Sequence, residues 1–173
     1  MAEDTDKWGV AAACCPALHG VALDLLPDSW QQQADFQQVF GASGWQQLQQ
    51  QTLRRYHQRC AVTSVPASEV PLHVLPLWRF DQIRKQVQLA QLAPVCQPLL
   101  QLQQQLLSED GLQGPEQHAA AVGLLQQVMV WEAAEVEKYL KYVQQRRQSL
   151  ERDGWQLLPP EASAWLAGAA AAE

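Results

Sequence analysis

The residue types best suited to chemistry in this chain are its four cysteines and four histidines. His57 and Cys60 are one helical turn apart, a spacing that would give a metal ion two ligands. A structural zinc site needs four ligands, and a convincing motif shows two such spaced pairs. The neighbours of Cys14 and Cys15 are small and apolar, not the cations that make a thiol reactive. We therefore expect no metal site and no cofactor, and we interpret the cysteines as reduced thiols.

A second group of reactive side chains is formed by the carboxylates of Glu132, Glu135 and Glu137. Helical di-iron sites require Glu-x-x-His on two helices, and this tetrapeptide does not occur in the sequence. Neither a nucleophile turn nor a glycine-rich phosphate loop occurs either. The spacing instead predicts Glu132 in the apolar seam of a helix, paired there with an arginine such as Arg79 or Arg84. We therefore expect a non-enzymatic protein.

Composition narrows the fold and the kinds of partner. The 173 residues include 28 Gln, 24 Leu and 24 Ala but one Ile, which favours helices over strands. The net charge of −6 argues against nucleic acid as a partner. We expect no membrane span, because no run of about 18 apolar residues occurs. The acidic start lacks the basic region of a secretory signal, so we expect a soluble intracellular protein, in the cytoplasm rather than an organelle interior.

Apolar residues recur at helical spacing through most of the chain after residue 27. The pattern predicts helices at about 28–40, 45–61, 76–93, 98–107 and 115–153, with a last short helix after Pro160. Three prolines exclude a helix over 62–76 and predict an extended connection there. Residues 1–26 are expected to form an N-terminal arm, and residues 27–173 a single helical domain. The predicted fold is all-α, an irregular bundle of five to six helices with a long C-terminal spine helix.

The predicted spine helix over 115–153 carries the strongest functional signal. Its apolar positions alternate in steps of three and four, which is coiled-coil spacing, and Glu137 and Lys141 are placed to form an ion pair. Trp131 widens the apolar stripe, and a wide stripe needs more than one neighbouring helix. Tryptophan and arginine dominate the binding energy of many interfaces. The residues predicted to contact a partner are Trp8, Trp131, Tyr139, Tyr142, Arg146 and Trp165.

The sequence is compatible with three functions. The leading hypothesis is a non-enzymatic protein-interaction subunit or assembly factor, in a complex with different proteins. The alternative is a self-contained helical domain whose tryptophan-rich interior binds a small apolar ligand or a pigment. The third is an enzyme assembled from dispersed residues that no motif pairs, namely His57, His118, Glu132 and Cys60.

Overall fold

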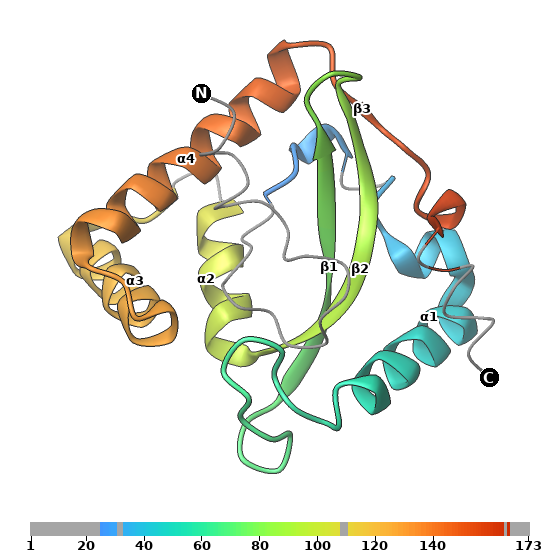
Figure 1. Cartoon of the computed structure of the whole chain (residues 1–173), viewed down its shortest axis with the longest axis horizontal. Helices are drawn as coiled ribbons and strands as arrows, with labels where there is room; N and C mark the ends of the chain where they lie inside the picture. The colour runs from blue at the N-terminus through green and yellow to red at the C-terminus, as the bar shows by residue number, and fades with distance from the viewer. Residues whose placement is uncertain (1–24, 31–32, 108–110, 165, 167–173) are drawn as a thin grey trace.

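The computed structural model describes residues 25–30, 33–107, 111–164 and 166. These residues form four α-helices and a mixed three-stranded sheet (Figure 1). The elements, with η denoting a short 3-10 helix, are η1 (Asp28–Trp30), α1 (Phe36–Arg55), β1 (Leu72–Asp81), β2 (Gln86–Cys96), α2 (Gln97–Leu107), α3 (Gly114–Met129), α4 (Ala133–Arg152), β3 (Gln156–Leu157) and η2 (Pro160–Ala162). The predicted all-α bundle of five to six helices is therefore wrong.

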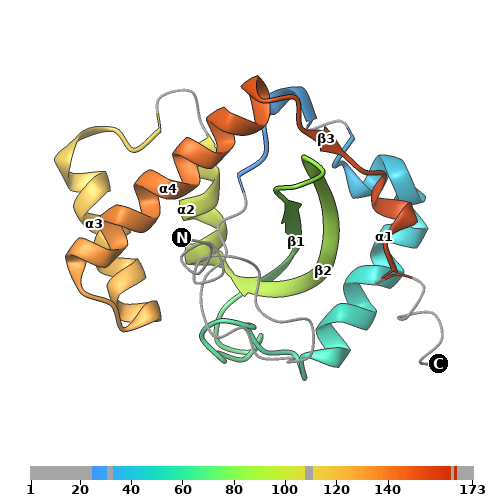
Figure 2. The ribbon, with the colours of Figure 1, turned by 45° about the horizontal axis from the view of Figure 1, so that its top comes forward.

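A long, curved β-hairpin formed by β1 and β2 lies at the centre of the molecule (Figures 1 and 2). The strands are antiparallel, with Leu72 opposite Cys96 at one end and Asp81 opposite Gln86 at the turn. The register shifts after Leu77, where β2 carries one extra residue, and such a bulge bends and twists a hairpin. The short strand β3 pairs in parallel with the turn end of β2, which makes the sheet mixed.

This hairpin stands where the spacing predicts a helix over 76–93. Trp78 lies opposite Leu89, and Phe80 lies opposite Val87, so these side chains share one face of the sheet. That face packs against α1 and against the end of α4 and the residues that follow it. Leucine, glutamine and alanine favour a helix in isolation. Burial of this apolar face overrides that preference, because strand formation depends mainly on packing.

Two prolines fit into the sheet because of where their backbone lies. Pro76 is predicted at the start of a helix but lies in β1, which is an edge strand of the described sheet. The missing N–H of a proline is tolerated on an edge. Pro94 in β2 uses its carbonyl to accept the N–H of Ala61 at 2.8 Å. The extended connection predicted over 62–76 overlaps the sheet at its end, because β1 begins at Leu72.

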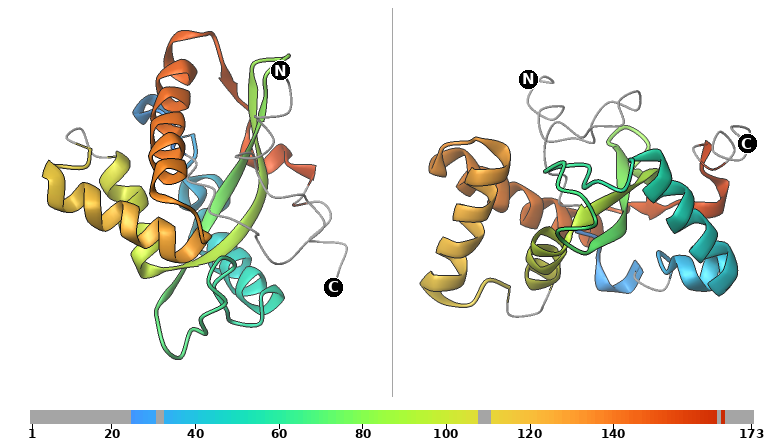
Figure 3. Two further views of the ribbon diagram at one scale, coloured as in Figure 1. Left: turned by 60° about the vertical axis from the view of Figure 1, so that its left-hand side comes forward. Right: turned by 90° about the horizontal axis from the view of Figure 1, so that it is seen from below.

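The predicted spine helix over 115–153 is divided into α3 and α4 at Val130. The prediction of a coiled coil, which depended on one continuous helix, is therefore wrong as well. Val130 adopts the left-handed conformation, with φ 57° and ψ 38°, and its N–H donates to the carbonyl of Gln126 at 2.9 Å. The two helices meet there at a corner (Figure 3). No glycine marks this break in the sequence, so the continuous apolar spacing concealed it.

The other helices lie closer to their predicted positions. Asp35 caps α1 by accepting the N–H groups of Gln37 and Gln38 at 3.0 and 3.2 Å. Gly41, with φ 72°, kinks this helix at the predicted break between two helices. Helix α2 begins one residue before the predicted range 98–107 and ends with it.

The hairpin joins the two larger of three hydrophobic clusters in the described part of the chain. The first core gathers α2, α3, α4 and the last residues of β2, and the second gathers α1, the apolar face of the hairpin and Trp155. Of the predicted arm over 1–26, the structure describes Leu25 and Leu26, which are buried in the first and second core respectively. The rest of the arm lies outside the described residues.

The turn of the hairpin is closed by Asp81. Its Oδ1 atom accepts the N–H of Ile83 at 3.0 Å and the N–H of Arg84 at 2.9 Å. Lys85 then adopts a positive φ of 54°, which returns the chain into β2. A short acceptor side chain at this position is a recognised turn former, because it replaces backbone hydrogen bonds.

We expect Asp81→Ala to lower the free energy of unfolding by about 1 kcal/mol, because two backbone donors lose their acceptor. Asp81→Asn keeps an acceptor oxygen and should lose much less. If residues 76–93 formed a helix instead, Asp81→Ala would raise the free energy of unfolding, since alanine is the better helix former. Urea denaturation of the three proteins, followed by circular dichroism, measures the difference.

Candidate functional site

The residues predicted to contact a partner form two aromatic groups in the structure. Trp131 stacks edge-on against Tyr139, with ring centroids 5.5 Å apart. Tyr139 is 1% exposed and belongs to the first core, whereas Trp131 is partly buried against it. Tyr139 therefore supports Trp131 from inside. Trp8 and Trp165 lie outside the described residues.

Arg146 is the centre of the second group. Its guanidinium carbon lies 4.1 Å from the ring centre of Phe80 and 5.3 Å from that of Tyr142. Phe80 packs edge-on against Trp155 at 6.3 Å, and the Nζ atom of Lys85 lies 5.0 Å from the Trp155 ring centre. Arg146 is 8% exposed, so its charge is held by aromatic faces in the interior. It ties α4 to the hairpin.

Glu132 does not occupy the buried seam predicted for it. It is the exposed N-cap residue of α4 and lies directly after the corner at Val130. Arg79 is exposed on the sheet, and the Nε atom of Arg84 lies 3.9 Å from the carboxylate of Asp81. The predicted buried pair is therefore wrong, because the break between α3 and α4 moves Glu132 to the surface.

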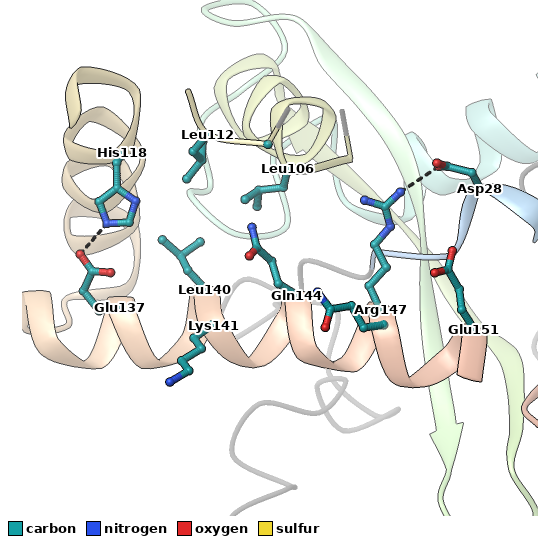
Figure 4. A pocket seen from close by; sticks show the side chains of 12 residues that line it. Asp28, Leu106, Leu112, His118, Glu137, Leu140, Lys141, Gln144, Arg147 and Glu151 are labelled. Atoms are coloured by element: carbon teal, nitrogen blue, oxygen red, sulfur yellow. Dashed lines mark hydrogen bonds and ion pairs between the residues drawn. The ribbon is translucent and has the colours of Figure 1, made fainter. Parts of the chain in front are cut away.

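An open groove of about 710 Å³ runs along the exposed side of α4 (Figure 4). A polar contact stands at each end: a hydrogen bond of 2.6 Å between His118 Nε2 and Glu137 Oε1, and an ion pair in which Arg147 Nη2 lies 2.9 Å from Asp28 Oδ1. Between them lie three leucines, Leu106, Leu112 and Leu140. Glu137 therefore contacts α3 and does not form the ion pair with Lys141 that its spacing predicted.

The groove does not contain a catalytic arrangement among its described lining residues. The His118–Glu137 pair is about half exposed and is joined there by no hydroxyl or thiol that it could activate. The other dispersed residues of the enzyme hypothesis are also apart. His57 is exposed after α1, Cys60 is buried, and Glu132 is at the corner. No hydrogen bond or ion pair joins any two of these four residues, all of which the structure describes.

The corner between α3 and α4 carries an exposed apolar group. We define the corner surface as Met129, Val130, Trp131 and Glu132. Val130 is 89% exposed, and Met129 and Trp131 are partly exposed on either side of it. Glu132 is exposed as well. The sequence pattern indicated Trp131 but not Val130, because no spacing rule distinguishes a corner valine from a core valine.

We expect Arg146→Ala to lower the free energy of unfolding by about 2 kcal/mol or more, because it removes a buried stacked cation and its packing. The neighbouring Arg147→Ala is a matched control. Its ion pair with Asp28 is exposed on the Asp28 side, and no aromatic ring among the described residues stacks on Arg147, so the loss should stay at or below about 1 kcal/mol. Equal effects in chemical denaturation would contradict the interior role of Arg146.

Three further observations bear on what the protein can do. Within the described residues, no cluster of three or more His, Cys, Asp or Glu side chains is placed to hold a metal ion. None of the helices in this part of the chain combines the length and apolar character needed to cross a bilayer. Neither a family model, nor a curated protein, nor a solved structure matches this chain.

Proposed function

We propose that this protein is a non-enzymatic interaction module, a subunit or assembly factor that binds a different protein through the corner surface. The observation that carries the proposal is Val130, which is both strained and almost fully exposed. The left-handed conformation is disfavoured for all residues except glycine and, to a lesser degree, asparagine, and most of all for β-branched ones.

A helix end of this kind usually carries glycine, which removes the strain. Val130 keeps the strain and gains no packing in return, because its side chain points into solvent. The corner needs the left-handed conformation but not a branched side chain, so a valine at this position indicates a use outside the chain. Binding to another protein is such a use, since an exposed branched side chain fills an apolar pocket well.

The apolar surface elsewhere on α4 supports this choice of site. Tyr139, Val143 and Leu150 are all buried within the chain, so the helix needs no partner helix along its stripe. Ile83 at the hairpin turn is 96% exposed, but Gln82 and Arg84 on either side of it are polar. The corner surface therefore offers the larger contiguous apolar contact of the two.

The charges around the corner specify the chemistry of the partner. Glu132 is exposed beside Val130, and Glu135 follows in the first turn of α4. The last turn of α3 carries no basic residue. The complementary surface is an apolar pocket with a basic rim, because opposite charges steer and orient an encounter.

Two further features bear on where and with what the protein acts. Cys60 and Cys96 are free thiols buried in the same core, which fits a reducing compartment such as the cytoplasm. The tryptophan rings of Trp78 and Trp155 are buried against phenylalanine rings, so they fill the interior instead of lining a pocket for an apolar ligand. The packing therefore favours a protein partner over a small ligand.

The test compares Val130→Asn with Ile83→Asn in the tagged full-length protein. Asparagine tolerates the left-handed conformation, so we expect Val130→Asn to fold with unchanged or higher stability. We expect it to retain about tenfold less partner than the unchanged protein, as loss of an interface hot spot does. Ile83→Asn removes an equally exposed side chain and should retain the partner in full, as quantified by mass spectrometry after gel filtration.

Retention of a partner by the tagged protein does not by itself show where the partner binds. A cross-linking experiment therefore tests contact at the corner surface. A carbodiimide should join the Glu132 carboxylate to a lysine of the partner, and Glu132→Gln should abolish that link. Equal retention by the two asparagine variants would overturn the proposal. Loss of a homodimer in Val130→Asn, in place of a different protein, would overturn the choice of partner and identify a second copy of this chain.

A further inference from the structure

Two cysteines that are distant in the sequence meet inside the first core. Cys60 follows α1 and Cys96 ends β2, and they are 2% and 6% exposed respectively. The backbone holds the two segments together, because the N–H of Ala61 donates to the carbonyl of Pro94 at 2.8 Å. This hydrogen bond, one residue from Cys60 and two from Cys96, keeps the sulfurs beside each other.

Thr63 contacts both sulfur atoms. Its backbone N–H donates to Cys60 Sγ at 3.4 Å, and its hydroxyl donates to Cys96 Sγ at 4.0 Å. Both thiols belong to the same cluster of buried residues. The two sulfur atoms are therefore positioned close to each other before any reaction, because one residue contacts both of them.

The environment distinguishes the two thiols. Burial raises the pKa of Cys60, but hydrogen bonds from Thr63 and from the N–H groups of Val62 and Cys96 outweigh burial and leave the pKa lowered. Burial raises the pKa of Cys96, and the charge of the neighbouring Cys60 raises it further. Cys60 is thus the more acidic of the two thiols, and a thiolate is the reactive form of cysteine.

From this geometry we propose that Cys60 and Cys96 form a dithiol site for small hydroperoxides, with Cys60 attacking and Cys96 resolving. The Cys60 thiolate attacks one oxygen of hydrogen peroxide, so that an S–O bond forms while the O–O bond breaks. The leaving hydroxide takes the proton that Cys60 released and becomes water. The product on Cys60 is a sulfenic acid.

Cys96 then attacks the oxidised sulfur of Cys60. The S–S bond forms, the S–O bond breaks, and hydroxide leaves with the proton of Cys96 as a second water. The two sulfurs lose two electrons in total, and one peroxide is reduced to two waters. No other reductant or oxidant is needed for this balance.

Burial selects the oxidant by size. The sulfurs lie beneath the turn over 61–65, in which the N–H of Ser64 donates to the carbonyl of Cys60 at 2.9 Å and Ser64 has a positive φ of 60°. Local opening of a short surface turn is a low-energy fluctuation in folded proteins. Hydrogen peroxide is uncharged and close to water in size, so it enters through such an opening, whereas a peptide disulfide is excluded.

The test uses the full chain with Cys14→Ser and Cys15→Ser, which leaves Cys60 and Cys96 as the remaining thiols. Hydrogen peroxide under native conditions should lower the intact mass by about 2 Da, the loss of two hydrogens on disulfide formation. Peptide mapping should place the link between Cys60 and Cys96. Glutathione disulfide should leave the mass unchanged.

Three variants in this background separate the roles. Cys96→Ser should accumulate a sulfenic acid on Cys60 that a cyclic diketone traps, because no resolving thiol is present. Cys60→Ser should react about tenfold more slowly, because burial still disfavours the thiolate of Cys96. Thr63→Val preserves shape and both thiols while removing the hydroxyl, and it should slow disulfide formation several-fold.

The test of the disulfide itself does not require these variants to fold, since the parent protein retains the whole site. Free labelling of both thiols by a maleimide after peroxide treatment and unfolding would overturn the proposal. Equal peroxide reactivity of folded Cys60→Ser and Cys96→Ser proteins would overturn the assignment of attacking and resolving sulfur.

Discussion

Both hydrophobic cores depend on the pairing of β1 with β2. Side chains alternate across a strand, so the observed register sends Val74, Trp78 and Leu89 to the face that α1 covers. A slip of one residue would turn all of these side chains away from that face. The bulge after Leu77 bends the hairpin, and Cys96 at its far end enters the other core, where α2 follows directly. The positions of the helices therefore follow from one strand register.

The same hairpin determines which side chains α4 leaves for contacts outside the chain. The ring of Phe80, near the turn, stacks on the guanidinium of Arg146. The apolar side chains of α4 are buried in the two larger cores. The apolar face of α4, which the sequence suggests needs a partner helix, is thus already buried within the chain. What remains exposed is the corner around Val130, whose conformation costs energy that the interior does not recover.

The sequence predicts the features that depend on local spacing. Helix α2, the break at Gly41 and the acidic character belong to this class. The hairpin was missed because its clear alternation is confined to a few residues, such as Gln86–Leu89, amid residues with high helix propensity. The turn at Val130 carries no glycine, and the contact between Cys60 and Cys96 joins segments that no spacing rule connects. Both candidate sites therefore required the tertiary structure.

The two proposed sites rest on a single core. Cys60 and Cys96 belong to the same cluster as Val136 and Tyr139, and Trp131 packs against that cluster from the corner. Proximity within a core is not coupling, which requires an element with two arrangements. Helix α2 is the element between them, since it starts directly after Cys96 and packs its leucines against α3 and α4. A disulfide that displaced α2 would act on α3 and α4, because densely packed interiors transmit displacement through contiguous contacts.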